Sequence, residues 1–450
     1  MKPRLLLLNP PAARPTLRDD FCSSTSKAGY LWQPIDLICQ SGYLDADYDL
    51  RLLDAPVAQT AAGPAEEAIV AWRPEAIFSL TGSAAFPEDF EFLGRVAERL
   101  PAARLFVGGD LARFHPDWVL AEYPFIEGVV LDFTRPALRD CLAGRPADRS
   151  ALARRGETAS PLPLAAGEFS YPWPRHDLFW ALPYRMPFLG RPFASVLTNY
   201  GCANSCAYCN SCRIGFARRS FDNLFAELDR LDALGIRHLF VKDFTFNQPP
   251  ARARELLETW AARRYRFRWT GYLRAETIDA ELAALLARTG CVMAQIGLET
   301  ANQSALAAAR PGADLARARE GIAHLRRAGV SAGAHFIFGL PGDGEAGYDA
   351  TIALAESLPL AYASFNHYTN RPGARLAAES PATGIARLDP SGQAAADPAL
   401  SRWVGLAYRR FYRRPAYWFS LWRSARAAGS LAALWSMGVS WLAARLRKAA

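Results

Sequence analysis

Four of the eight cysteines in this 450-residue chain fall within eleven positions, in the segment NYGCANSCAYCNSC at 199–212. Cysteines spread along small secreted proteins commonly form disulfides. This chain is instead long enough to bury ordinary hydrophobic cores. Its first apolar run, which ends at Asn9-Pro10-Pro11, is too short for the core of a signal peptide. We therefore expect a reducing, cytoplasmic location, where clustered thiolates bind metal.

The cysteine segment offers two spacings for a metal site. A structural zinc site usually has two pairs of ligands separated by a longer stretch. No second pair is present here, and the six histidines lie far away in sequence. Cys206-x2-Cys209-x2-Cys212 copies part of a ferredoxin pattern, but the further Cys-Pro is missing. Cys202-x3-Cys206-x2-Cys209 is the other trio, and aromatic Tyr208 directly precedes its last cysteine.

The trio Cys202, Cys206 and Cys209 resembles the signature of the radical SAM superfamily. The resemblance implies a [4Fe-4S] cluster held by three thiolates, with S-adenosyl-L-methionine (SAM) bound to the fourth iron. An external donor of the flavodoxin or ferredoxin type would reduce the cluster, which then cleaves SAM to a 5′-deoxyadenosyl radical. Cys212 lies outside this trio, and we expect it to be a buried bystander. A role beside the cluster is the alternative.

Residues 191–385 alternate between strand-like and helix-like patterns, which predicts parallel βα units. The six expected strands lie at 193–198, 238–241, 267–272, 292–296, 334–338 and 362–368, and they predict a partial (β/α)6 barrel. Polar and glycine residues follow the carboxyl ends of these strands, where such barrels place their active sites. By the resemblance, Tyr208 (through its backbone), Arg274 and Glu299 contact SAM, and Asp243 is a further candidate.

Residues 1–145 show a second strand–helix alternation, which predicts a doubly wound α/β sheet with ligands at the carboxyl ends of its strands. Asn9-Pro10-Pro11, and Gly108-Gly109 followed by ARFHP at 112–116, resemble the cobalamin-binding domain that precedes the barrel in one subgroup of radical SAM enzymes. The resemblance implies cobalamin beside Thr81, Ser83, Gly108 and Gly109. A DxHxxG loop, which gives cobalt a histidine in some cobalamin proteins, is missing. A cobalamin-like domain that has lost its ligand is therefore the alternative.

Two segments lie outside these domains. Residues 146–190 are a connector whose aromatic side chains we expect to pack between the domains. Residues 386–450 are a basic, aromatic helical tail, in which arginines and aromatics interleave at 403–424 and no charge occurs at 427–444. We expect this tail to contact an anionic membrane surface peripherally, and we rank that above contact with nucleic acid. A basic helical cap on the barrel is the alternative.

The resemblance implies an enzyme that methylates an unactivated carbon of a small molecule through cobalamin. The tail favours a lipid-like or tetrapyrrole substrate. A radical oxidation, cyclisation or rearrangement without methyl transfer is the alternative among enzymes. An iron–sulfur protein that only transfers electrons is the remote alternative from another class.

Overall fold

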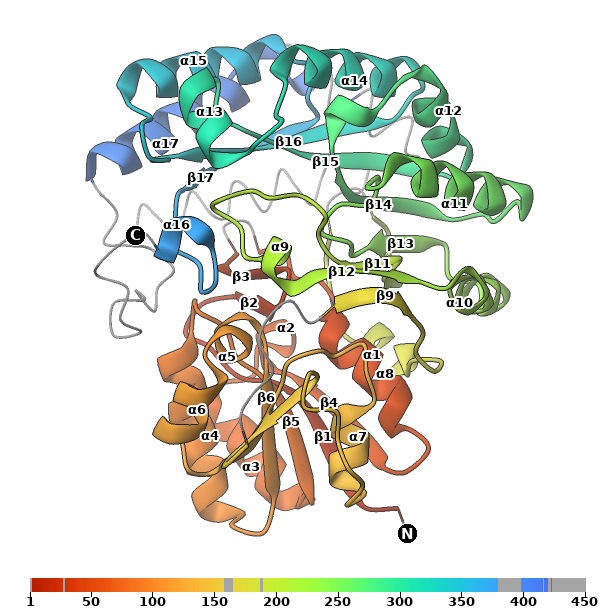
Figure 1. Cartoon of the computed structure of the whole chain (residues 1–450), viewed down its shortest axis with the longest axis vertical. Coiled ribbons are helices and arrows are strands. Elements are labelled where there is room, and N and C mark those ends of the chain that lie inside the picture. The colour runs from red at the N-terminus through yellow and green to blue at the C-terminus, as the bar shows by residue number, and fades with distance from the viewer. Residues whose placement is uncertain are drawn as a thin grey trace.

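The computed structural model describes residues 2–26, 29–157, 165–186, 189–378, 398–415, 417–419 and 422. Two α/β units lie one above the other in Figure 1, with the N-terminal unit below. Each unit is built on a six-stranded sheet, in the orders β4-β1-β5-β6-β7-β8 and β10-β13-β14-β15-β16-β17. The predicted doubly wound domain and partial (β/α)6 barrel are both confirmed.

The N-terminal sheet is covered by helices on both faces. Its strands are β1 (Arg4–Asn9), β4 (Asp49–Asp54), β5 (Ala76–Leu80), β6 (Arg104–Gly108), β7 (Ile126–Val130) and the antiparallel β8 (Leu152–Arg154). Its helices are α1 (Ile35–Leu44), α2 (Ala55–Ala58), α3 (Ala62–Trp72), α4 (Phe86–Arg99), α5 (Asp110–Phe114), α6 (Pro116–Glu122) and α7 (Ala137–Leu142). In β1, Leu5 and Leu7 pack into one core while Leu6 and Leu8 pack into another. This unbroken apolar run is typical of a strand buried on both faces.

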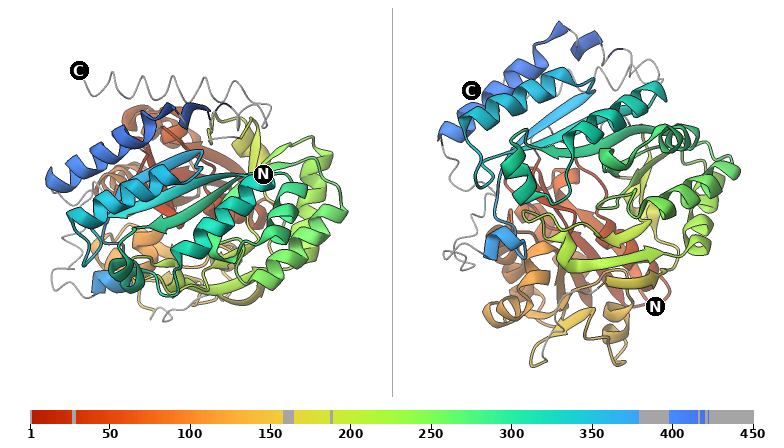
Figure 2. Two further views of the ribbon diagram at one scale, coloured as in Figure 1. Left: turned by 90° about the horizontal axis from the view of Figure 1, so that it is seen from above. Right: turned by 45° about the horizontal axis from the view of Figure 1, so that its top comes forward.

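The barrel strands are all parallel. They are β10 (Phe193–Val196), β13 (His238–Val241), β14 (Arg268–Leu273), β15 (Cys291–Glu299), β16 (Ser331–Phe338) and β17 (Tyr362–His367). The outer helices are α10 (Phe221–Ala233), α11 (Pro250–Ala262), α12 (Ala280–Arg288), α13 (Gln303–Ala309), α14 (Leu315–Arg327) and α15 (Glu345–Ser357), and η1 (Ala275–Thr277) is a short 3-10 turn. Figure 2 shows the helices side by side over one face of the strands. The opposite face is turned toward the N-terminal unit (Figure 1).

Several short elements lie between the two units. A hairpin of β2 (Thr16–Asp19) and β3 (Cys22–Thr25) follows β1, and a small sheet has the order β11-β12-β9. Its strands are β9 (Ala165–Phe169), β11 (Asn199–Gly201) and β12 (Gly215–Arg219). The short helices α8 (His176–Trp180) and α9 (Ser211–Ile214) lie nearby in the chain, whereas α16 (Arg375–Ala378) follows β17. The sequence predicted none of these strands. The small sheet positions the cysteine segment, because β11 and β12 lie on either side of it.

The connector packs between the two units, as predicted. Its Tyr171, Phe179 and Tyr184 are buried in one continuous core that also contains Leu5 of β1 and Phe240 of β13. Buried aromatic side chains contribute roughly 2 kcal/mol each through the apolar area that they remove from water. The units therefore share a core and are not joined by a loose linker.

The described part of the tail packs on the barrel. Helix α17 (Pro398–Tyr412) lies against β17, where the Tyr412 hydroxyl donates to the Ala363 carbonyl at 2.8 Å and accepts from the Ala363 amide at 3.2 Å. The Tyr408 hydroxyl accepts from the Phe365 amide at 3.3 Å. The predicted uncharged segment at 427–444 lies outside the described residues. Among the residues that the structure describes, no helix is both long and apolar enough to span a membrane.

Candidate active site at the cysteine loop

The cysteine loop leaves β10 and returns through α9 into β12. The Cys202 amide donates to the Gly215 carbonyl at 2.9 Å, which closes the base of the loop. Farther along, the Ala207 amide donates to Ala309 and its carbonyl accepts from Leu376, at 2.8 and 2.9 Å. Backbone bonds to β12, α13 and α16 thus hold the loop over the carboxyl ends of the barrel strands.

Cys202, Cys206 and Cys209 are half-buried on this loop. Burial, together with the nearby Cys209, Glu299 and Cys202, raises the pKa of Cys206 to about 12 against the opposing charge of Arg310. The three thiols are therefore close enough to affect each other's ionisation. Thiolates gathered in this way are stabilised when metal replaces their protons.

The cysteine trio supplies the kind of ligand that holds an iron–sulfur cluster. No three of the described His, Cys, Asp or Glu side chains are grouped to hold one metal ion. In a [4Fe-4S] cluster each thiolate binds a different iron, so its ligands are spread around the cluster. The thiol trio supplies three such ligands on one short loop.

Cys212 lies on α9, outside the trio. Its thiol is half-buried and donates to the Cys209 carbonyl at 3.6 Å. This contact lies at the turn after the loop, and the role of Cys212 as a bystander stays a prediction.

Asp243 follows β13 and is fully buried. Its carboxylate accepts from the amides of Thr198 and Asn199 at 2.7 and 3.1 Å, from Asn199 Nδ2 at 2.9 Å and from the Thr198 hydroxyl. Burial raises the pKa of Asp243 to about 6, although these bonds oppose the shift. All four bonds go to residues directly before the cysteine loop, so Asp243 fixes where that loop begins.

Glu299 is hydrogen-bonded to Tyr208 of the cysteine loop. The Tyr208 hydroxyl donates to Glu299 Oε1 at 2.7 Å, and burial raises the pKa of Glu299. Glu299 has a φ of 62°, a strained conformation for a residue with a side chain. A Cβ at Gly297 would lie 2.2 Å from Glu299 Oε1, so only glycine leaves room for the Glu299 carboxylate there.

Two charged residues that the sequence analysis missed, Arg310 and Glu276, lie on this side of the site. Arg310 donates to the Gly297 carbonyl at 2.6 Å and pairs with Glu276 at 3.0 Å. Arg274 lies on the same side, with its Nε 3.8 Å from Glu276. An arginine that ends the apolar run ALAAAR was the available signal for Arg310.

Arg274 also contacts the cysteine loop directly. Its guanidinium donates to Asn204 Oδ1, and Asn204 Nδ2 lies 3.3 Å from Cys202 Sγ. The predicted SAM contacts Tyr208, Arg274 and Glu299 thus gather beside the cysteines, whereas Asp243 supports the loop from behind.

The four predicted cobalamin contacts lie together at the carboxyl ends of β5 and β6. The Thr81 amide donates to the Gly108 carbonyl at 2.8 Å, and the Ser83 amide and hydroxyl donate to Asp110 at 2.9 and 2.7 Å. Gly109 has a φ of 111°, and a Cβ there would lie 2.0 Å from the Thr81 carbonyl oxygen. The backbone is therefore closely packed at this edge and Ser83 is bonded to Asp110, whereas Thr81 Oγ1 is buried with no hydrogen-bond partner among the described residues.

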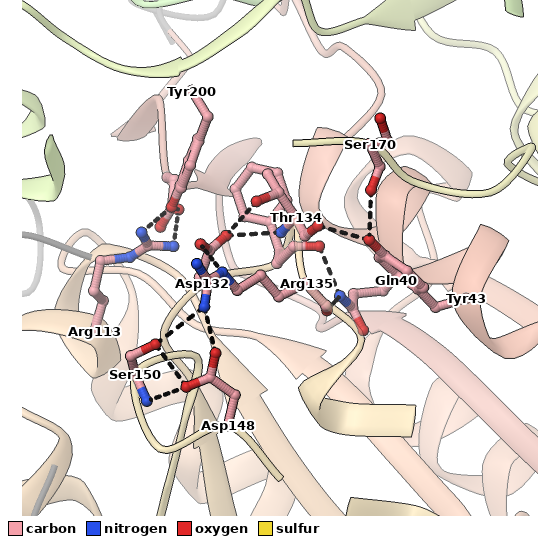
Figure 3. Close-up of polar contacts among 12 residues, drawn as sticks. Gln40, Tyr43, Arg113, Asp132, Thr134, Arg135, Asp148, Ser150, Ser170 and Tyr200 are labelled. Atoms are coloured by element: carbon pink, nitrogen blue, oxygen red, sulfur yellow. Dashed lines mark hydrogen bonds and ion pairs between the residues drawn. The ribbon is translucent and has the colours of Figure 1, made fainter. Parts of the chain in front are cut away.

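A buried polar network joins this edge to the cysteine loop. Arg113 of α5 pairs with Asp20 and contacts the hydroxyl of Tyr200, and that hydroxyl lies 3.1 Å from Asp20 Oδ2. Figure 3 shows Arg113 and Tyr200 facing one another. Tyr200 lies two residues before Cys202, so the N-terminal unit contacts the base of the loop. Close by, Lys242 pairs with Asp19 at 2.9 Å.

The sequence and the fold of this chain are similar to those of known proteins. Residues 196–355 match the family model of the radical SAM superfamily. An uncharacterized methyltransferase of Pyrococcus horikoshii is 25% identical over 358 residues, which cover 76% of this chain and 77% of that protein.

Two solved structures share the fold of both units. The radical SAM methyltransferase TsrM from Kitasatospora setae, solved with tryptophan and a SAM analogue, superposes with a TM-score of 0.63 at 19% identity, over 83% of this chain and 74% of that one. OxsB, a cobalamin-dependent SAM radical enzyme solved with aqua-cobalamin and SAM, superposes with a TM-score of 0.58 at 15% identity, over 81% of this chain and 53% of that one. Residues 196–355 are thus a radical SAM domain, and the chain as a whole has the fold of cobalamin-dependent radical SAM enzymes.

Proposed function

We propose that the protein transfers a methyl group from cobalamin to an unactivated carbon of a small molecule, in a reaction that begins with reductive cleavage of SAM. The observation that carries this proposal is the contact between the edge of the N-terminal sheet and the base of the cysteine loop through Arg113 and Tyr200. A corrinoid on that edge would lie beside the cluster. The similarity to a methyltransferase over three quarters of both chains supports methyl transfer over other radical chemistry.

The residues present fit the three cofactors. Cys202, Cys206 and Cys209 would hold the cluster, while Tyr208, Arg274 and Glu299 would border SAM, with Asp243 behind them. The cluster and SAM supply a carbon-centred radical when bound, and cobalamin supplies the methyl group.

The carboxyl ends of β5 and β6 offer cobalamin a row of small residues, which are Thr81, Ser83, Gly108 and Gly109. Small residues let a bulky planar ligand approach the backbone closely. No histidine occurs between β1 and α1, so that loop has none to donate to cobalt.

The inner face of the barrel supports a substrate with hydrogen-bonding groups. Tyr272, Gln295, Gly333 and Tyr362 lie in register across four strands on the face that the outer helices leave uncovered. The Tyr362 hydroxyl donates to Gln295 Oε1 at 2.8 Å and lies 3.0 Å from His335 Nε2. This polar face favours a tetrapyrrole or a similar heteroatom-rich molecule over a purely hydrocarbon lipid.

The test uses the full chain, reconstituted with iron, sulfide and cobalamin in the absence of oxygen, then reduced and given SAM with a deuterated methyl group and a small-molecule extract of the source cells. We expect 5′-deoxyadenosine, S-adenosylhomocysteine and a metabolite that carries the deuterated methyl. The Cys206→Ala variant is the matched control and should give none of them. Deoxyadenosine without labelled product would indicate radical chemistry without methyl transfer, and the absence of both products would favour an electron-transfer protein.

Three further assignments belong to this proposal. We assign residues 1–145 to the cobalamin domain, 146–190 to the connector, 191–385 to the barrel and 386–450 to the tail. A flavodoxin- or ferredoxin-type protein would supply the electron. The tail would contact an anionic membrane surface, because Trp418, Phe419 and Trp422 are 47%, 61% and 45% exposed at the end of the described region.

A further inference from the structure

Asn204 is oriented toward a cluster ligand by an arginine. It lies between Cys202 and Cys206, with Nδ2 3.3 Å from Cys202 Sγ and Oδ1 accepting from Arg274. A guanidinium can only donate hydrogen bonds, so the amide oxygen must face Arg274. The amide NH2 group therefore faces the sulfur.

Arg274 is itself fixed before any ligand binds. Its backbone amide donates to Asn247 Oδ1 at 2.8 Å, and Asn247 Nδ2 donates back to its carbonyl at 2.8 Å. The side chains of Arg274 and Glu276 are 14% and 7% exposed, and Arg310 holds Glu276 at 3.0 Å. Asn204 thus has little freedom to turn its NH2 group away from Cys202.

A second cluster ligand also has a hydroxyl beside it. Ser211 Oγ lies 3.0 Å from Cys209 Sγ. A thiolate has no proton to give, so Ser211 is the donor once Cys209 binds iron. Thr245 differs, because its hydroxyl lies 3.7 Å from Cys202 Sγ and already donates to the Phe244 carbonyl at 2.8 Å.

We propose that Asn204 is a positioning residue that raises the reduction potential of the cluster by donating a hydrogen bond to Cys202 Sγ, and that Arg274 holds its amide in that orientation. The inference rests on the proposed function only in requiring the [4Fe-4S] cluster. Reduction adds negative charge to the cluster and its sulfurs, so a donor stabilises the reduced state more than the oxidised one. Hydrogen bonds to sulfur are among the factors that set iron–sulfur potentials.

The test is a redox titration of the reconstituted full chain, without SAM, followed by electron paramagnetic resonance of the reduced cluster. Iron and sulfide are counted in every sample. We expect Asn204→Ala and Arg274→Met to shift the midpoint potential to more negative values, and Ser211→Ala to shift it in the same direction. Thr245→Val is the matched control at the same sulfur and should leave the potential unchanged.

An Asn204→Ala variant with full iron content and the wild-type potential would overturn the proposal. If Asn204→Ala does not assemble a cluster, Asn204→Leu decides, because it keeps a side chain of similar size and removes the donor without changing any charge. An unchanged potential in that variant would also overturn the proposal. The titration does not depend on methyl transfer, whereas failure of the wild-type chain to bind iron would count against the proposed function.

Discussion

At the scale of single residues, two thiols of the cysteine loop lose their protons less readily than an ordinary cysteine does. Burial and the neighbouring charges raise the pKa of Cys206 to about 12, and burial also raises the pKa of Cys209. These thiols therefore keep their protons at neutral pH until iron displaces them. Loading the loop must release protons, as it does wherever metal replaces a thiol proton.

The structure predicts different outcomes for the four clustered cysteines. Replacing Cys202, Cys206 or Cys209 by Ala should remove most of the bound iron and the cluster's visible absorption, because each supplies one of three ligands. Cys212→Ala should retain both, because that thiol lies outside the trio and donates to the carbonyls of Cys206 and Cys209. Iron counting after anaerobic reconstitution measures the difference. Loss of iron in Cys212→Ala, with retention in Cys202→Ala, would show that the ligand trio is misassigned.

The resemblance predicted that the cysteines and Glu299 belong to one site, and the structure brings them together, while their roles as cluster ligands and SAM contact stay predictions. The resemblance was not enough to identify Asn204 or Arg310. Their roles depend on contacts with Arg274 and Glu276, which lie 70 and 34 positions away in the chain. The direction of a side chain across such separations follows from the packed barrel and leaves no periodic signal.

At the scale of elements, the barrel strands and helices were predictable and the small sheet was not. β9 (AAGEF) and β11 (NYG) lack the run of large apolar residues by which the buried barrel strands were found. β9 also pairs with β12 in a register that joins Ala165 to Gly215, fifty residues apart. Only the folded chain brings these strands together around the cysteine loop.

Helix α17 is the part of the tail that packs on the barrel, and further residues of the tail follow it. Arg410 pairs with Glu356 at 2.6 Å and with Asp349 at 2.7 Å, and Arg414 donates to the Glu356 carbonyl. These two arginines are therefore already occupied on the barrel, as the alternative of a basic helical cap predicted. Any membrane contact has to come from other residues of the tail.

We predict that anionic vesicles capture the full chain in flotation experiments and that high salt partly releases it, because part of the attraction is electrostatic. Truncation after Pro415 should abolish capture while leaving α17 on the barrel. Combined replacement of Trp418, Phe419 and Trp422 by Ala should weaken it. Arg410→Gln is the matched control and should float like the wild type. No capture at low salt would leave the tail only its role as a cap.

At the scale of the whole molecule, the two units meet through buried charges. Burial raises the pKa of Asp20 from its usual 3.8 to about 7, opposed mainly by the charge of Arg113. A carboxyl with a raised pKa binds a proton more tightly in the folded chain than in the unfolded one. Its contribution to the free energy of unfolding is therefore largest at low pH and falls as pH rises toward about 7.

This linkage predicts a pH-dependent difference between the wild type and Asp20→Asn. As pH rises from about 4 to about 7, the stability of the wild type should fall relative to the variant, by at most about 1.4 kcal/mol for each pH unit. Urea unfolding of the full chain across that range measures it. The exposed Asp117→Asn serves as control. Parallel stability curves for wild type and Asp20→Asn would contradict the assignment.

The tyrosine hydroxyls of α17 have a consequence for how copies of this protein behave together. A sheet that does not close into a full barrel ends in a strand whose free amides and carbonyls can template a strand from another molecule. At β17 the amides of Ala363 and Phe365 and the carbonyl of Ala363 are bonded by Tyr412 and Tyr408. The open edge of the barrel at β17 is thus protected against pairing with a strand from another copy of the protein.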